Sequence, residues 1–432
     1  MKYIIAIICF ILTSITILQE GVYYNLLFTI LNLVIAFICV KALFLSRRDN
    51  YSLYKIFYLF VLFFFCIAPT IQFKDGVRLM DTFFSEEEYI LTTSLVLLLI
   101  IMYHFFYKHF YKIFVIKKQT KNNITSLKLS TYKELLFVFI SLSICIYVLY
   151  INNFNLISLL FRSGDNRIEQ SQTSWLIVEY FCRPMAMIIF LSAYIIKVKH
   201  KIVLPILFIL MLIALPPTGM ARFSVAAIYT PVLLCLVPMI RKGNRFILLM
   251  FSGLLIIFPM LDIFRYFNSD VSVEYRLNFD QFKELHFDSY SMFMRVLRAD
   301  IITYGQQLLG VIFFFIPRSM WYGKPIGSGA MIAESEGLEF TNLSMPYFGE
   351  GYINFGFIGI LFFVVLLSYI TAKIDKWYWV GQASQPFNVD HILYMIILSL
   401  LLFILRGDLL SSFAYTCGFV SSFYFIKRLS VK

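Results

Sequence analysis

Four arginines close or follow long apolar runs of the chain: Arg222, Arg265, Arg318 and Arg406. A guanidinium group presents a fixed fork of N–H donors that matches the oxygens of a phosphate group. If the apolar runs cross a membrane, all four side chains lie at one face, at the level of the lipid head groups. Each arginine taken alone could instead reach a lipid head group or pair with a nearby acid such as Asp408. The four together, with Lys324 beside them, favour a shared anionic ligand.

Candidate acids and aromatic residues lie close to these arginines in the sequence. Glu350 is the carboxylate nearest the outer end of an apolar run, where a carboxylate is costly unless it pairs with an arginine or exchanges a proton. Asp288, within Phe287–Tyr290, offers a second carboxylate. Trp321, Tyr322 and Tyr352 provide flat faces of the kind on which sugars stack, although an ordinary belt of interfacial aromatics is the alternative.

Other kinds of chemistry find little support in the sequence. The seven cysteines all fall inside apolar runs without paired spacing, so we read them as buried apolar residues rather than disulfides or metal ligands. The five histidines have no metal-ligand spacing, and we expect no metal site. The sequence also lacks a Walker motif, a dinucleotide-binding GxGxxG after a strand and a GxSxG nucleophile elbow, and nucleotide-driven chemistry is not expected.

The composition defines the setting of these residues. Of 432 residues, 60% are hydrophobic and 14% are charged, whereas about a quarter of the residues in a soluble domain are charged. This excludes a soluble enzyme, a secreted disulfide scaffold and a disordered chain. An all-α polytopic membrane protein remains, and the net charge of +12 is therefore a matter of membrane sidedness rather than nucleic-acid binding.

Runs of roughly 20 apolar residues predict about twelve transmembrane helices. We expect these at 3–18, 23–45, 52–72, 89–107, 134–152, 175–196, 202–217, 223–240, 246–264, 349–370, 391–405 and 409–426. The chain thus divides into spans at 1–264, a large outer loop at 265–345, and further spans at 346–432. Within the large loop, the apolar stretch Leu308–Pro317 is too short to span and is expected at the interface or re-entering the bilayer.

The charges of the connecting segments predict the orientation. Segments on the side of both termini carry most of the lysine and arginine and few acids, whereas the opposite segments are net acidic. By the positive-inside rule, both termini are cytoplasmic and the loop at 265–345 lies outside.

Several of these segments resemble the O-antigen polymerases (Wzy), also called oligosaccharide repeat-unit polymerases. The resemblance is carried by Pro317–Pro325, Gly349–Gly356, Phe287–Tyr290 and the Gly-x-x-Arg that ends at Arg222. It implies a multi-pass protein of the bacterial inner membrane and a metal-independent glycosyltransferase that needs no cofactor. Such a protein moves a growing glycan from its undecaprenyl diphosphate carrier to a new lipid-linked repeat unit at the outer face of the membrane.

The resemblance also implies roles for the candidate residues. The diphosphate is held by the basic residues Arg222, Arg265, Arg318, Lys324 and Arg406. Arg318 also stabilises charge during the reaction, and either Glu350 or Asp288 takes the proton of the acceptor hydroxyl. Sugar contacts are expected from Trp321, Tyr322, Tyr290, Tyr352 and Asn354. The implied partners are the lipid-linked donor and acceptor, the bilayer, a chain-length regulator and a flippase, with no nucleic acid.

Other membrane functions stay open at this point. A flippase or other transporter would suit the number of spans but typically shows internal repeats and charges near the midplane. Here the main intramembrane charges are Glu179 and Arg183, four residues apart and so placed to pair. An O-antigen ligase, which moves the glycan to a lipid A core, would share the arginines and the large loop. A transferase that uses a polyprenyl monophosphate sugar would need a larger acidic first outer loop than residues 19–22, and a purely structural role is the simplest alternative.

Overall fold

The structure is a computed structural model, and it describes residues 2–46, 49–115, 129–155, 159–160, 172–257, 279–382 and 387–431. Regular structure in these ranges is entirely helical. The helices up to residue 252 are α1 (Lys2–Leu18), α2 (Leu26–Val40), α3 (Leu53–Leu62), α4 (Ala68–Lys74), α5 (Glu86–Ile113), α6 (Thr131–Ile151), α8 (Gln172–Leu176), α9 (Arg183–Ile196), α10 (Val203–Ala214), α11 (Arg222–Leu236) and α12 (Arg245–Ser252). The later helices are α14 (Ser289–Ala299), α15 (Gln306–Ile312), α16 (Ser328–Ser335), α17 (Tyr347–Lys376), α18 (Asp390–Arg406) and α19 (Leu409–Val431).

Every apolar stretch predicted as a span contains a helix. In the stretch 246–264, the helical structure is described as far as residue 257. Within the described ranges, seven helical segments are long and apolar enough to cross a membrane. They are Leu26–Leu45, Leu53–Lys74, Glu86–Ile113, Thr131–Ile151, Ser174–Ile196, Tyr347–Gly381 and Leu409–Ser430. The prediction of an all-helical chain is confirmed for the described residues, and these seven apolar helices are consistent with a membrane protein. The number of about twelve spans stays a prediction, because the other apolar helices are shorter than a bilayer requires.

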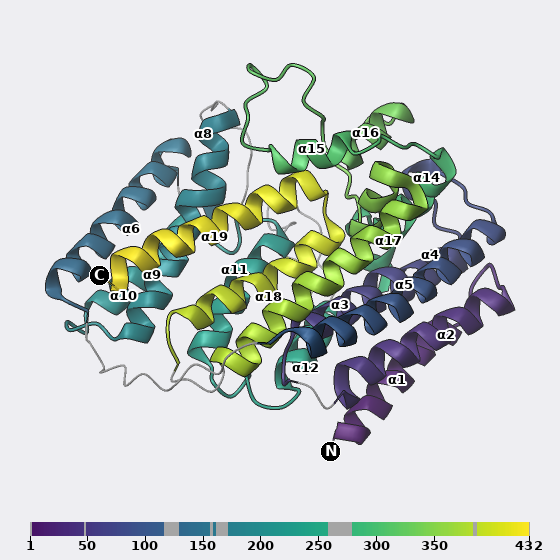
Figure 1. The fold of residues 1–432 in the computed structure, drawn as a ribbon, viewed down its shortest axis with the longest axis horizontal. Helices are drawn as coiled ribbons and strands as arrows, with labels where there is room; N and C mark the ends of the chain where they lie inside the picture. The colour runs from purple at the N-terminus through teal and green to yellow at the C-terminus, as the bar shows by residue number, and fades with distance from the viewer. Residues whose placement is uncertain are drawn as a thin grey trace, which may run out of the picture.

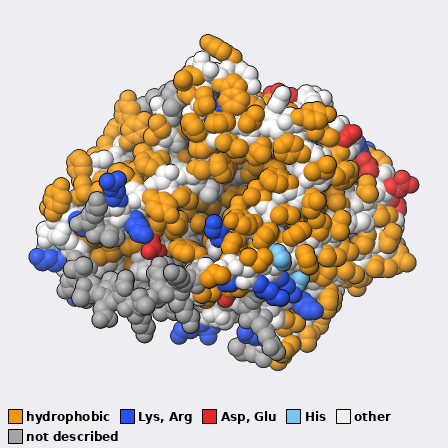
Figure 2. Space-filling model, in the orientation of Figure 1, with side chains coloured by type: hydrophobic (Ala, Val, Ile, Leu, Met, Phe, Trp, Pro, Cys, Tyr) orange, Lys and Arg blue, Asp and Glu red, His pale blue; other side chains and the backbone are white. Residues whose placement is uncertain are grey.

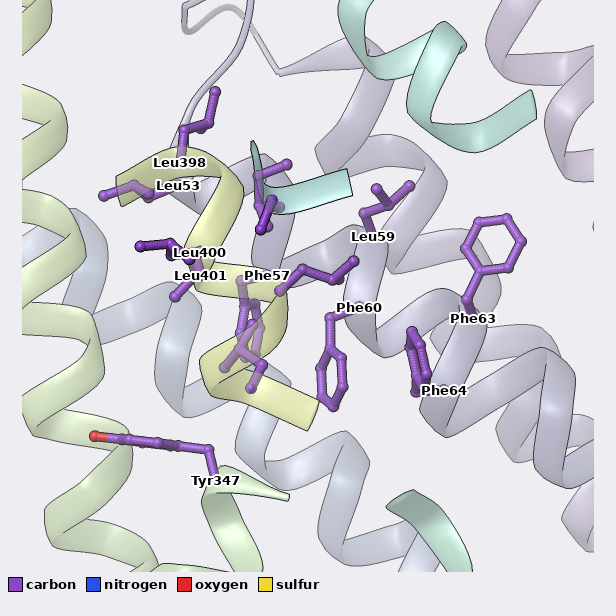
Figure 3. Close-up of a cluster of buried hydrophobic side chains, with 14 of the residues drawn as sticks. Leu53, Phe57, Leu59, Phe60, Phe63, Phe64, Tyr347, Leu398, Leu400 and Leu401 are labelled. Carbon is purple, nitrogen blue, oxygen red and sulfur yellow. The ribbon is translucent and has the colours of Figure 1, made fainter. Parts of the chain in front are cut away.

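The helices form one bundle around α3 and α18 (Figure 1). α5 packs along α17, α11 along α18, and α19 against α9, while α1 and α2 pair at one edge of the bundle. All residues from Tyr51 to Lys74 are buried. Figure 3 shows how phenylalanines and leucines of α3, among them Phe57 and Phe60, lie beside Leu400 and Leu401 of α18. A helix that is apolar on all sides becomes the core of such a bundle, because only other helices can cover its whole circumference.

Most of the charged side chains visible in Figure 2 lie toward the two ends of the bundle. Blue lysine and arginine side chains lie along the lower and left rim of Figure 2, and red acidic side chains at its upper right, with an apolar surface between. Both chain ends lie at the lower and left side (Figure 1). We call these the basic end and the acidic end of the bundle.

At the basic end, one buried carboxylate joins four helices. Asp375 of α17 accepts hydrogen bonds from the backbone N–H groups of Leu53 (2.9 Å) and Tyr54 (3.2 Å), which begin α3. It also accepts from the hydroxyls of Tyr107 in α5 (2.6 Å) and Tyr394 in α18 (2.7 Å). Since Asp375 is fully buried, this carboxylate caps α3 and fixes where the four helices meet.

At the acidic end, α17 is broken rather than continuous, in contrast to the single run predicted at 349–370. Phe355 (φ −146°) and Gly356 (φ 62°) leave the helical conformation. The two halves then pack so closely that a Cβ atom on Gly359 would stand 1.9 Å from the carbonyl oxygen of Gly351. Only glycine permits this approach and the positive φ at residue 356. The break holds the short first half of α17, with Glu350, beside the rest of the bundle.

Candidate functional site

An open cavity of about 1360 Å³ lies at the acidic end. Its wall comes from five separate parts of the chain: residues 77–80, the start of α11 with the turn before it, residues 283–288, residues 340–344, and the turn between α18 and α19. The wall combines apolar side chains such as Met220, Val225 and Phe403 with charged ones. A cavity of this kind suits a ligand that has both an apolar and a charged part.

The charged side chains of the cavity wall include both signs. The basic groups are Arg78, Lys283 and Arg406, and the acidic groups are Glu284, Asp288 and Asp408. His286, which lies between Glu284 and Asp288 in the sequence, also lines the cavity. Of the predicted site residues, Arg406 and Asp288 therefore lie in the cavity wall together. These two residues approach one another, since an Arg406 Nη2 atom lies 3.5 Å from Asp288 Oδ1.

Arg406 is fixed by backbone as well as by Asp288. Its Nε donates to the carbonyl oxygen of His286 at 2.9 Å, and its Nη2 reaches the carbonyl oxygen of Leu285 at 3.3 Å. These contacts tie the end of α18 to the segment before α14. A guanidinium held in this way is preorganised, so an incoming phosphate would meet it without ordering a flexible side chain.

Asp288 is held mainly by Ser344, which also lines the cavity. The Ser344 hydroxyl donates to Asp288 Oδ1, and the Ser344 backbone N–H donates to Asp288 Oδ2 at 3.3 Å. Asp288 is nearly fully buried and yet belongs to the wall. Its position therefore allows contact with a ligand in the cavity while its rotamer stays fixed.

Asp408 caps two helices from the edge of the cavity. Its Oδ1 accepts from the N–H of Leu410 (3.0 Å) at the start of α19, and its Oδ2 from the N–H of Gly329 (3.1 Å) at the start of α16. Burial raises the pKa of the Asp408 carboxyl, although these N–H groups oppose the shift. The structure therefore gives Asp408 a clear role in joining the large loop to α19.

Of the three basic side chains in the cavity wall, that of Arg78 makes the fewest contacts with other described residues. Its side chain makes no hydrogen bond or ion pair with another described residue, although its backbone carbonyl accepts from the N–H of Asp81 (3.2 Å). Its guanidinium carbon stands 5.6 Å from the centre of the Phe83 ring. Lys283, in contrast, forms ion pairs with Asp75 (2.7 Å) and Asp280 (2.6 Å). Hydrogen bonds from Lys283 to Asp280 and Asp75 raise the pKa of this lysine. A ligand could therefore bind the Arg78 guanidinium without breaking an existing hydrogen bond or ion pair of that side chain.

The loop that carries Arg78 is held by a buried arginine of α14. Arg295, which is fully buried, donates to the carbonyl oxygen of Leu79 (3.0 Å), to the Thr82 hydroxyl and to Glu336. Between these anchors, Met80 and Asp81 adopt positive φ angles of 55° and 54°. Such angles are unfavourable for residues other than glycine and persist only where surrounding contacts impose them.

Glu350 does not belong to the cavity wall. It is buried in the first half of α17, where its Oε2 accepts from the Ser328 hydroxyl (2.7 Å) and its Oε1 from the N–H of Leu409 (2.9 Å). It therefore connects the same two helices, α16 and α19, that Asp408 connects. Of the two candidate bases, Asp288 is the one that faces the cavity.

Arg318 and Lys324 also lie outside the cavity wall. Arg318 donates to the carbonyl oxygens of Lys324 (2.7 Å) and Pro325 (3.1 Å). The Lys324 ammonium donates to the carbonyl oxygens of Phe314 (2.6 Å) and Ile316 (2.8 Å). Burial, with the nearby Arg318 charge, lowers the pKa of Lys324. The structure thus does not bring these two residues together with Arg406.

The predicted sugar-binding residues are dispersed. Tyr290 is fully buried, and its hydroxyl forms a hydrogen bond with the Thr93 hydroxyl (2.6 Å). Asn354 is also fully buried, and its Oδ1 accepts a hydrogen bond from the N–H of Leu308 (2.8 Å). Tyr352 is buried and donates to Asp300 at 2.5 Å. Each of these three has a packing role in this conformation. Trp321 and Tyr322 lie on the loop between α15 and α16, away from the cavity wall.

Two further predicted residues cannot be placed. Arg265 lies outside the described ranges. α11 begins at Arg222, next to cavity residues Met220 and Ala221, but the Arg222 side chain is not described. In the described ranges, histidine, cysteine, aspartate and glutamate form no cluster that could hold a metal ion.

The structure adds groups that the sequence argument missed. Arg78 was overlooked because its loop is predominantly acidic, and Lys283 because it stands far from any apolar run. Away from the cavity, the expected pairing of Arg183 with Glu179 is confirmed by bonds of 2.5 and 2.7 Å, and Arg183 Nε also donates to the carbonyl oxygen of Ala214 at 2.7 Å.

Comparison of the chain with models of known protein families, with curated proteins and with solved structures finds no match.

Proposed function

We propose that this protein is a membrane glycosyltransferase that polymerises oligosaccharide repeat units carried on undecaprenyl diphosphate, as its resemblance to the Wzy polymerases implies. The observation that carries the proposal is the cavity at the acidic end, where Arg406, Arg78 and Asp288 line one space together with apolar side chains of the membrane helices. A lipid-linked diphosphate glycan has an apolar chain, an anionic centre and a polar glycan, which are the three kinds of group this wall could contact.

In this proposal the diphosphate leaves from the basic part of the cavity. The acceptor hydroxyl oxygen attacks the anomeric carbon of the donor glycan, and the bond from that carbon to the diphosphate oxygen breaks. The diphosphate takes the electron pair, and Arg406 and Arg78 stabilise its growing negative charge. The proton of the acceptor hydroxyl passes to Asp288. The donor bond supplies the free energy, so no nucleotide is required.

The proposal assigns the cavity to the outer face of the bacterial inner membrane and both termini to the cytoplasm. The charge difference between the two ends of the bundle supports this orientation, because basic residues collect at the end where both termini lie. The acidic end then opens to the side on which lipid-linked repeat units are displayed.

The test is reconstitution of the purified protein in liposomes with undecaprenyl-diphosphate-linked repeat units. We expect glycans of several units to form, and we expect Arg406→Gln to reduce their formation by about 100-fold, since a buried charge-assisted contact contributes roughly 2–5 kcal/mol. Arg245→Gln, at an exposed arginine of the basic end, is the matched control and should match wild type. Transfer only to an added lipid A core would identify a ligase, and no transfer at all would refute the proposal.

A further inference from the structure

The segment 313–326, which joins α15 to α16, projects from the bundle and carries apolar side chains at its tip. We call it the projecting loop; it rises above α15 in Figure 1, and Figure 2 shows orange apolar atoms at the same place. Exposed fractions are 66% for Phe315, 78% for Met320 and 89% for Tyr322. On α15 itself, Leu309 and Ile312 are about half exposed. Water would cover this apolar surface at a considerable cost in free energy.

The two basic side chains of the projecting loop form hydrogen bonds with the backbone of the same loop. Arg318 and Lys324 together donate to four carbonyl oxygens of the segment 314–325. Backbone N–H groups of Ile316, Met320 and Trp321 also find acceptors within the loop. A non-helical segment can enter an apolar environment only if its backbone groups are satisfied internally, and here two basic side chains supply the missing donors.

The position of the projecting loop along α19 indicates its depth. The Phe314 ring packs edge-on against the Phe413 ring, with centroids 6.1 Å apart. Phe413 follows Leu409, the first residue of the apolar segment Leu409–Ser430, by four positions, which corresponds to about 6 Å along a helix. Segments that lie in the membrane interface bury their apolar face to about this depth.

We propose that the projecting loop and the exposed face of α15 insert into the boundary between lipid head groups and acyl chains at the acidic end of the bundle. The partner surface is the lipid bilayer itself. Trp321 and Tyr322 then act as interfacial anchors rather than as sugar-stacking residues. The proposal depends on the chain being a membrane protein and not on the reaction it performs, so the two can fail separately.

The test measures depth directly. Met320→Cys and Tyr322→Cys carry a nitroxide spin label in protein reconstituted into phosphatidylcholine–phosphatidylglycerol vesicles. Glu334→Cys on α16, an exposed position away from the loop, serves as the aqueous control, and labelled wild type gives the background of the native cysteines. We expect frequent collisions with oxygen and few with a water-soluble nickel chelate at 320 and 322, and the opposite at 334.

Two outcomes would overturn the proposal. Collisions with the nickel chelate at 320 and 322 as frequent as at 334 would place the loop in water. Labels shielded from both oxygen and nickel would show that protein, such as a second copy of the chain, covers the loop. A second variant tests the role of the basic side chains: Arg318→Gln in the Tyr322→Cys background should move the label toward water, and an unchanged depth would contradict the proposed backbone support.

Discussion

The two ends of the bundle use buried carboxylates in opposite ways. At the basic end, Asp375 receives four hydrogen bonds from three helices and does not line the open cavity at the acidic end. At the acidic end, Asp288 is as well held, but it stands beside Arg406 in the wall of a large open cavity. A buried carboxylate whose hydrogen-bond donors are all neutral protein groups stabilises the fold. One that shares an accessible space with cations is in a position to act on a ligand.

The largest effect we expect is on stability at the basic end. Asp375→Ala leaves two backbone N–H groups and two tyrosine hydroxyls without their acceptor in the core, which should cost more than about 4 kcal/mol. We expect little folded protein in detergent by size-exclusion chromatography. Asp390→Ala, which removes a partly exposed ion pair with Lys427, is the control and should cost less than about 1 kcal/mol. Equal behaviour of the two variants would contradict the structural role of Asp375.

The next effect separates the two candidate bases. Asp288→Asn should lower polymer formation by about 10²–10⁴-fold, the range of general-base contributions, without loss of folded protein. Glu350→Gln should retain most activity and lower the melting temperature, because Glu350 connects Ser328 and Leu409 rather than facing the cavity. If Asp288→Asn keeps its activity and Glu350→Gln loses it without loss of folded protein, Glu350 would be the general base instead. Activity in Asp288→Asn together with inactivity in His286→Gln would assign the base to His286.

A smaller effect on activity is expected from Arg78, whose side chain makes no hydrogen bond or ion pair with the described residues. Arg78→Gln should raise the substrate concentration needed for half-maximal rate by about tenfold, since a hydrogen bond to a charged group contributes roughly 1.5–3 kcal/mol. The melting temperature should not change, because the Arg78 side chain makes no hydrogen bond or ion pair with another described residue. Rates measured over a range of lipid-linked substrate concentrations check this. An unchanged concentration dependence would remove Arg78 from the site.

The smallest effect is pH dependence at the edge of the cavity. The pKa of Lys283 is raised from 10.5 by its bonds to Asp280 and Asp75, so its stabilising contribution is complete below pH 10.5 and is lost as the pH rises through the folded-state pKa. Because the pair is partly exposed, Lys283→Met should cost less than about 1 kcal/mol at pH 7. The difference in melting temperature from wild type should shrink above pH 10.5. A difference that persists there would mean that lost packing, not charge, explains it.

The helices could be predicted from the sequence because an apolar run long enough to span a bilayer needs no knowledge of its neighbours. The break at Phe355 and Gly356 could not, since it depends on the close packing of Gly351 against Gly359. The same limit applies to the site. The sequence predicts similar depths for Arg406 and Arg318, but sequence spacing does not reveal where around the bundle each side chain points. Arg78 lies in an acidic loop, and only the fold brings that loop to Arg406.

The measurement that tests the central claim most directly is the ladder of surface glycans on gels from cells that lack this protein and carry either the wild-type gene or Arg406→Gln. We predict that deletion leaves acceptors capped with a single repeat unit and no longer chains. The wild-type gene should restore the ladder, and Arg406→Gln should not. A ladder of normal length in the deletion strain would contradict the proposed polymerase function. Loss of the single unit as well would point to a flippase or a ligase instead.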